Sequence, residues 1–149
     1  MQEKKFGPYS LKGENEESTW EGRRLTGRHW GTPIEELKVD NTYSEDWSIE
    51  EGTLKPKIPG VKGKYFMKRV KVSDEEVVYE GYSKMMGFTT PLRMTATRNR
   101  LINRGIGKAE DMEEARSELR IEPPISDEDW AEYIKTKPSE GEQKYERAF

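Results

Sequence analysis

The sequence predicts a small α+β protein, in which an antiparallel sheet or β-hairpin core over residues 18–82 is followed by two or three short helices over residues 90–135. Three observations lead to this prediction: an alternating pattern over residues 63–72, helix-start signals after residue 88, and few apolar residues anywhere. Leu, Ile, Val and Phe together provide 25 of the 149 residues. That share is about 17%, below the roughly 20% at which disorder becomes common. We therefore expect extended irregular arms at both ends.

The expected organisation has three parts: an extended arm over residues 1–17, one domain over residues 18–135 and a polar tail over residues 136–149. The arm contains Gly7, Pro8 and Gly13 and little apolar material. After it, Trp20 and Leu25 flank a predicted short strand. Residues 32–37 combine an N-cap residue, a proline and two acids, which indicates at most one or two helical turns.

A β-hairpin over residues 63–82 is the strongest structural prediction, because side chains of alternating character indicate a half-buried strand. The mostly apolar set is expected to face the core and comprises Phe66, Lys68, Val70 and Val72. The opposite, more basic set is expected to face water and comprises Tyr65, Met67, Arg69 and Lys71. Residues 73–76 form the predicted turn and residues 77–82 the returning strand. Residues 53–60 contain two prolines, so any strand there is expected at a sheet edge.

Three segments after residue 88 carry helix signals. Thr90 and Pro91 resemble a helix start, and Gly105 provides the matching stop. A second helix is expected over residues 109–120, where apolar residues recur at spacings of three and four. After two prolines, Ser126 begins a predicted third helix that ends near residue 135 and carries Trp130 and Tyr133 on one face.

Charge is divided into blocks along the chain. The net charge is −4 over residues 1–50, +7 over residues 51–105 and −6 over residues 106–149. The basic middle segment can bind an acidic partner, or the acidic ends of the chain can fold back and neutralise it.

Composition removes several classes of function. The chain has no Cys and a single His, which excludes disulfides, thiolate chemistry and a His-rich metal cluster. No apolar run reaches the roughly 18 residues of a membrane span, so we expect a soluble protein or one peripheral to a membrane at most. The N-terminus lacks an apolar signal core, and a targeting segment that had already been removed would leave no trace.

No motif indicates catalysis, a metal or a cofactor, so we predict none of the three. Gly105, Gly107 and Lys108 lack the spacing and the hydroxyl residue of a phosphate-binding loop. His29 lies between Arg28 and Trp30, where a structural or interfacial role fits better than that of a general base. The paired acids occur in turns or at helix starts, and no acid–base pair can be assigned from them.

An RNA-binding or ribosome-associated protein is the main alternative function. Basic and aromatic residues mix over residues 62–69, and residues 93–104 add several arginines, so the basic segment 55–104 could contact phosphates. Against this, the match to the RRM consensus is poor and the isoelectric point is about 5.5. An unrecognised small enzyme is a second alternative.

The function that we predict is that of a non-enzymatic, peripheral accessory or linker subunit, which docks on a large multi-subunit assembly and stabilises it. The chain is too poor in apolar residues for a large private core, yet aromatic residues make up 10% of it, and Trp, Tyr and Arg anchor interfaces. A membrane-bound photosynthetic complex such as a photosystem, or a respiratory complex, is the expected host, which implies the soluble side of a plastid or mitochondrial membrane. The predicted partner-binding residues are Trp30, Trp47, Arg69, Arg93, Arg98 and Arg100.

Overall fold

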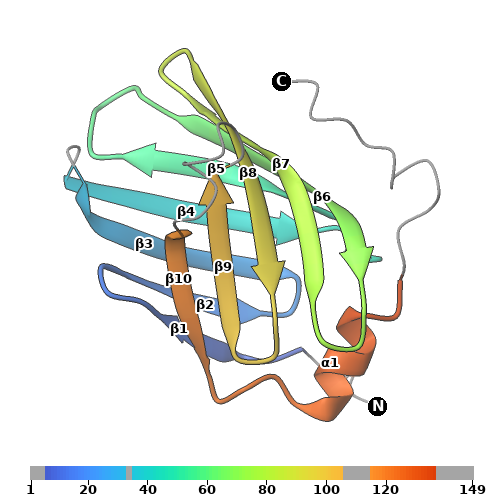
Figure 1. The fold of residues 1–149 in the computed structure, drawn as a ribbon. Coiled ribbons are helices and arrows are strands. Elements are labelled where there is room, and N and C mark those ends of the chain that lie inside the picture. Colours follow the sequence, from blue (N-terminus) through green and yellow to red (C-terminus); the bar gives the residue numbers. More distant parts are fainter. Residues whose placement is uncertain (1–5, 33–34, 106–114, 137–149) are drawn as a thin grey trace.

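The computed structural model is a closed barrel of antiparallel strands with one short helix at one end (Figure 1). It describes residues 6–32, 35–105 and 115–136. The first five strands are β1 (Tyr9–Lys12), β2 (Glu16–Glu21), β3 (Arg24–Thr32), β4 (Glu35–Tyr43) and β5 (Ile49–Pro56). The next five are β6 (Gly63–Val72), β7 (Val77–Met85), β8 (Phe88–Ala96), β9 (Arg100–Gly105) and β10 (Ala115–Glu122). Helix α1 (Asp127–Tyr133) follows.

The topology is a simple up-and-down meander. Each strand pairs with the next one along the chain, and β10 pairs with β1, where Leu11 lies opposite Ile121. Closure of the sheet removes every free edge. The turns β2–β3, β4–β5, β6–β7 and β8–β9 lie at the end that carries α1, here called the closed end. The β1–β2, β5–β6 and β7–β8 turns lie at the opposite end, here called the open end (Figure 1).

The predicted fold class, a small sheet followed by two or three helices, is wrong. The described chain contains one helix, and residues 88–105 form β8 and β9 instead of the predicted helix. Leu92, Met94 and Ala96 are buried while the residues between them are half-exposed, and this period of two is that of a strand. The pair Thr90–Pro91 resembled a helix start, but tertiary pairing with β7 decides the conformation.

Other segments also differ from the sequence-based expectation. The segment 1–17, expected as an extended arm, supplies β1 and the start of β2. The strand in residues 53–60 is β5, which is paired on both sides rather than at an edge. The part of the predicted helix 109–120 that is described belongs to β10, and residues 106–114 and 137–149 lie outside the described residues.

The predicted hairpin and the last predicted helix are confirmed. Strands β6 and β7 pair around the turn 73–76, and Ser126 caps α1 by accepting a hydrogen bond from Asp129 N at 3.1 Å. The predicted inward face of β6, however, is wrong up to Arg69; after the register shift between Arg69 and Lys71, Val72 packs against the core as predicted. Tyr65, Met67 and Arg69 point inward and are buried, because the barrel interior provides partners for their polar groups.

A plug of aromatic side chains fills the closed end. Phe6 and Trp20 have ring centroids 4.8 Å apart, and Trp47 and Tyr133 have theirs 5.3 Å apart. Arg69 is fully buried among these rings and donates hydrogen bonds of 2.8 Å to the carbonyls of Tyr133 and Thr136 and to Tyr79 Oη. These hydrogen bonds hold α1 over the closed end of the barrel.

Two side chains of α1, Asp129 and Trp130, complete the closure. Asp129 accepts hydrogen bonds from Tyr9 Oη at 2.6 Å and from Gly7 N at 3.0 Å, and Trp130 Nε1 donates to Asp74 O at 2.8 Å. Within the described residues, no helix is long and apolar enough to cross a membrane.

Candidate ligand-binding cavity

A cavity of about 450 Å³ occupies the barrel between the aromatic plug and the open end. Its volume lies within the roughly 300–1,000 Å³ of small-molecule sites. The apolar part of its wall comprises Leu25, Leu37, Val39, Leu54, Met85, Leu92, Met94, Leu101 and Leu119. Each of the strands β2 to β10 supplies at least one side chain to the cavity wall.

Small inward-facing residues leave this space open. Ser18, Val39 and Ser83 stand at inward positions of β2, β4 and β7. Within the plug, inward positions of the same strands carry Trp or Tyr instead. Gly52 also faces inward and lies against Asn41: a Cβ at Gly52 would stand 2.2 Å from Asn41 Oδ1 and 2.1 Å from Asp40 O. Only glycine permits this close approach of β4 and β5.

A buried pair, Asn41 and Glu50, provides the most unusual polar contact of the cavity wall. Asn41 lies opposite Gly52 in the β4–β5 ladder, so Glu50 is its diagonal neighbour on the same face. The two side chains are 3% and 1% exposed, and Asn41 Nδ2 donates to Glu50 Oε2 at 3.1 Å. Asn41 Nδ2 is the donor in this contact, which leaves the amide oxygen Asn41 Oδ1 without a hydrogen-bond partner among the described residues.

Burial dominates the electrostatics of Glu50. Desolvation raises the pKa of Glu50 from 4.5 to about 7, and the neighbouring side chains of Asn41 and Tyr43 limit this rise. Neither Glu50 Oε1 nor Tyr43 Oη completes a hydrogen bond of normal geometry with a described residue, and Asn41 Oδ1 also lacks a partner. Buried polar atoms without partners are rare, because each loses its hydration and gains nothing in return.

A second polar pair crosses the cavity from β9 to β6. Asn103 Nδ2 lies 3.3 Å from Tyr65 Oη, and Asn103 Oδ1 is buried without a partner among the described residues. Burial is the main cause that raises the pKa of Tyr65 well above 10, so Tyr65 stays a neutral hydroxyl. Three buried oxygens of residues that line the cavity therefore lack a hydrogen-bond partner among the described residues: Glu50 Oε1, Asn41 Oδ1 and Asn103 Oδ1.

His29 stands nearer the open end, beside Glu16. The two residues are directly opposite in the β2–β3 ladder, and His29 Nδ1 lies 3.2 Å from Glu16 Oε2. Both line the cavity. Sequence reasoning favoured a structural or interfacial role for His29 over catalysis, and this prediction stays open.

A larger hollow of about 820 Å³ lies outside the barrel, between α1 and the β2–β3 and β4–β5 turns. Its buried carboxylate, Asp129, is already held by Gly7 N and Tyr9 Oη. None of the residues that line it has a buried side-chain nitrogen or oxygen without a partner. It offers no buried group for a ligand to satisfy.

The six predicted partner-binding residues separate into two groups in the structure. Trp47 and Arg69 are 4% and 0% exposed and belong to the plug, so they are not on the surface of the folded chain. Trp30, Arg93, Arg98 and Arg100 face outward and are at least partly exposed. They do not form one cluster with each other: Trp30 stacks with Arg28, whereas Arg93 pairs with Glu80 at 2.6 Å and Arg98 with Asp127. Their role in partner binding stays a prediction.

Sequence reasoning missed the cavity residues Asn41, Glu50, Tyr65 and Asn103. One signal was present: Leu37, Val39, Asn41 and Tyr43 alternate with polar residues, which is the period of a strand. Nothing in a single sequence shows that Asn41 and Glu50 face the same interior. No group of three or more potential metal ligands occurs among the described residues. No protein-family model, curated protein or solved structure matches this chain.

Proposed function

We propose that the protein binds a small, largely apolar molecule inside its barrel, through a ligand group that donates hydrogen bonds. The observation that carries this proposal is the set of buried oxygens without hydrogen-bond partners on Glu50, Asn41 and Asn103, in a cavity that nine apolar side chains also line. A donor such as an amine, a hydroxyl or an amide N–H satisfies them, whereas a ligand carboxylate adds further acceptors.

The wall composition supports an apolar ligand body. Leucine, valine and methionine side chains surround the polar group, and burial of apolar surface contributes roughly 25 cal/mol per Å². A few convergent polar groups within an apolar cavity are typical of small-molecule sites, where they fix the orientation of the ligand. Barrels of eight or more strands commonly enclose ligands, an analogy of architecture that supports the proposal without identifying the ligand.

The proposal is a binding function without a chemical step. The accessory-subunit function expected from the sequence stays a separate prediction. Its premise, that the chain cannot bury its aromatic residues alone, does not hold in the structure, because Trp20, Trp47 and Trp130 are all buried within the chain.

A pair of tryptophan substitutions on β4 tests the proposed cavity. Val39 is half-buried and lines the cavity, whereas its neighbour Lys38 faces outward. Val39→Trp is expected to fill the cavity and abolish the fluorescence increase of Nile red, a neutral apolar dye, on binding. Lys38→Trp adds the same ring outside and is expected to leave the dye affinity unchanged. Equal dye binding by both variants would show that the dye binds elsewhere and would remove the support for the cavity.

A further inference from the structure

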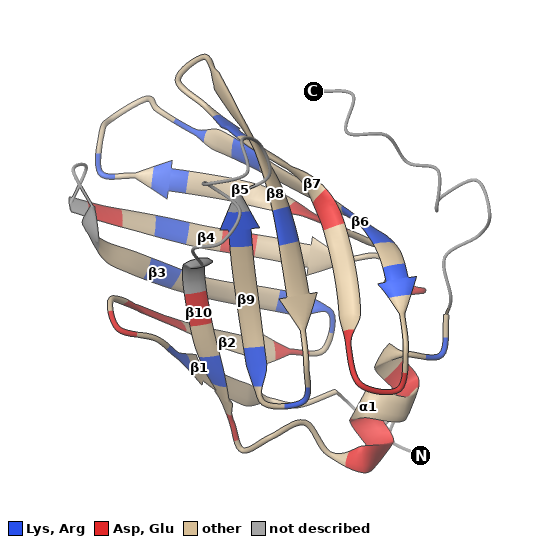
Figure 2. Ribbon diagram, viewed as in Figure 1, with Lys and Arg blue, Asp and Glu red and all other residues tan. Residues whose placement is uncertain are grey.

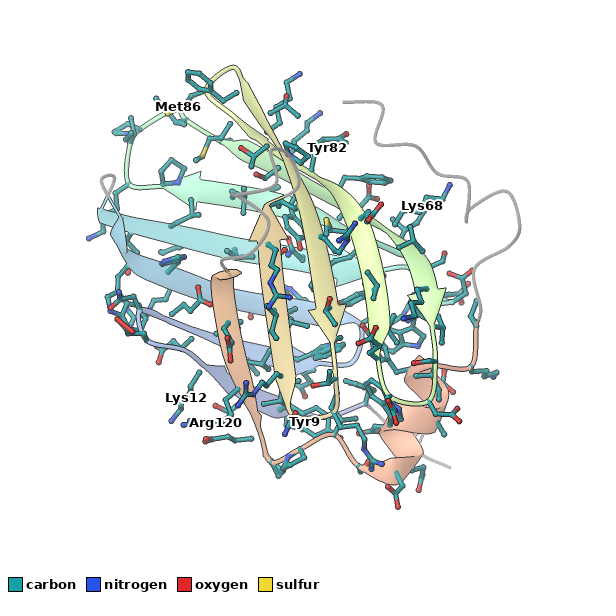
Figure 3. All side chains as sticks on the ribbon, viewed as in Figure 1. Tyr9, Lys12, Lys68, Tyr82, Met86 and Arg120 are labelled. Carbon is teal, nitrogen blue, oxygen red and sulfur yellow. The ribbon has the colours of Figure 1, made fainter. Side chains whose placement is uncertain are left out.

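The open end of the barrel carries two neighbouring loops with an unusual surface. The β5–β6 and β7–β8 connections lie side by side, because Lys64 pairs with Lys84, and a Cβ at Gly63 would lie 3.1 Å from Met85 Cβ. Three large apolar side chains are exposed there, and we call them the apolar tip: Ile58, Met86 and Phe88. Phe88 is 77% exposed and Met86 58% exposed, and both lie on the hairpin that projects beyond the barrel end (Figures 1 and 3).

The turn of this hairpin does not explain why Met86 is there. Met86 and Gly87 both have positive φ, of 55° and 83°, as in the two-residue turns that favour Asn-Gly or Asp-Gly. Methionine rarely adopts this left-handed conformation, and in water its exposed side chain gains nothing. An apolar surface that it could enter accounts for its presence at this position.

The apolar tip is surrounded by positive charge. Residues 52–64 and 81–91 contain no Asp or Glu. They carry five exposed lysines, which we call the basic rim: Lys55, Lys57, Lys62, Lys64 and Lys84. Lys57, Lys62, Lys64 and Lys84 form no ion pair with a described residue. Acidic residues gather instead on the β1–β2 side of the same end (Figure 2).

We propose that the apolar tip and the basic rim together dock the protein on a lipid bilayer that contains anionic phospholipids. Lysines near an anionic surface add attraction, and an apolar group on a projecting turn can enter the boundary between headgroups and acyl chains. A single-stranded RNA would use the lysines and one ring, but it would leave Ile58 and Met86 without an apolar partner. The proposal does not depend on ligand binding in the cavity.

Co-sedimentation of the full chain with vesicles tests the proposal. Vesicles of phosphatidylcholine mixed with phosphatidylserine are expected to bind the protein, and binding should weaken as salt is added because the attraction is screened. Vesicles of phosphatidylcholine alone are expected to bind it much less. Equal binding to both vesicle types would contradict the role of the basic rim.

Two variants separate the two components. Met86→Ser with Phe88→Ser is expected to lower partitioning by roughly tenfold or more, because the apolar area is lost. Lys57→Gln with Lys62→Gln is expected to lower it by roughly 25-fold, at about fivefold per lysine. The charge-matched control, Lys12→Gln with Lys135→Gln, changes exposed lysines away from the rim and should leave partitioning unchanged.

Three results would overturn the proposal. The first is vesicle binding that the tip variant leaves intact. The second is tight, salt-dependent binding to single-stranded RNA without vesicle binding. The third is self-association that the tip variant abolishes, again without vesicle binding, which would make the tip a contact between copies. All of these assays are run without a cavity ligand, so they are independent of the proposed ligand-binding function.

Discussion

Asn41 Nδ2 donates a hydrogen bond of 3.1 Å to Glu50 Oε2 between two neighbouring strands of the barrel. The pair faces an apolar cavity, and one oxygen of each side chain has no hydrogen-bond partner among the described residues. A ligand that donates a hydrogen bond to this pair would supply the missing partner.

The first prediction concerns the pH dependence of stability that Glu50 causes. The pKa of Glu50 is about 7 in the folded chain and 4.5 ordinarily, so the folded state retains the proton that the unfolded chain releases. Between about pH 5 and about pH 8, the free energy of unfolding should therefore fall by roughly 2–3 kcal/mol from this residue. Urea denaturation of the ligand-free wild type and of Glu50→Gln at both pH values measures the effect.

Glu51 provides the matched control for this measurement, because it is the next residue on β5 and faces outward. Glu51→Gln should retain the fall in stability with pH, whereas Glu50→Gln should lose that part of it. An unchanged pH dependence in Glu50→Gln would mean that Glu50 is not the buried titrating carboxyl.

The second prediction concerns Gly52, which makes room for Asn41. A Cβ at this position would stand within 2.2 Å of both Asp40 O and Asn41 Oδ1, so β4 and β5 must separate. Gly52→Ala should lower the free energy of unfolding by about 1–3 kcal/mol and weaken binding of Nile red. Glu51→Ala, on the outward face, should change both by much less; a fully stable Gly52→Ala would show that the two strands are not so close.

The third prediction concerns Arg69, which joins α1 to the barrel. Its guanidinium donates to two carbonyls near the end of α1 and to Tyr79 Oη. Arg69→Met leaves these acceptors buried, and charge-assisted bonds contribute roughly 1.5–3 kcal/mol each. We expect a loss of about 3 kcal/mol or more in unfolding free energy and faster amide exchange over residues 127–134.

Arg100→Met is the control for Arg69, since Arg100 pairs with Glu118 at the surface. Exposed ion pairs contribute about 0–1 kcal/mol, so this variant should remain close to the wild type in both measurements. Similar losses in the two variants would indicate that the Arg69 network contributes nothing specific to closure.

The fourth prediction distinguishes Trp30 from Trp47, which the sequence analysis assigned to the same set of partner-binding residues. Trp47 is in the plug, where truncation to Ala should cost about 3–5 kcal/mol of stability and lower the melting temperature. Trp30 lies outside beside Arg28, so Trp30→Ala should barely change the melting temperature. If Trp47→Ala melts like the wild type, the plug is not the core of the closed end.

Local patterns in the sequence predicted individual elements better than their assembly. The alternation in residues 63–72 and the cap at Ser126 produced a correct hairpin and a correct helix. The inward face of β6 could not be read from hydrophobicity, because Arg69 and Tyr65 are buried by partners that lie far away in the chain, such as Tyr133 and Asn103. Closure of the barrel depends on pairing between β1 and β10, more than 100 residues apart, which no local pattern reports.

The cavity was unpredictable for the same reason. In the sequence alone, Glu50 is one acid among many. Its character comes from burial and from Asn41 on the neighbouring strand, and both depend on the register of β4 and β5.

Competition between decylamine, decanol and decanoate for the Nile red site tests the central proposal most directly, because the three ligands share one chain and differ only in the head group. At about pH 8, above the pKa of about 7 of Glu50, the wild type should bind the amine and the alcohol more tightly than the carboxylate. Glu50→Gln should lose most of the preference for the amine. Preferential binding of decanoate, or displacement of the dye by none of the three, would contradict a cavity built to accept hydrogen bonds from an apolar ligand.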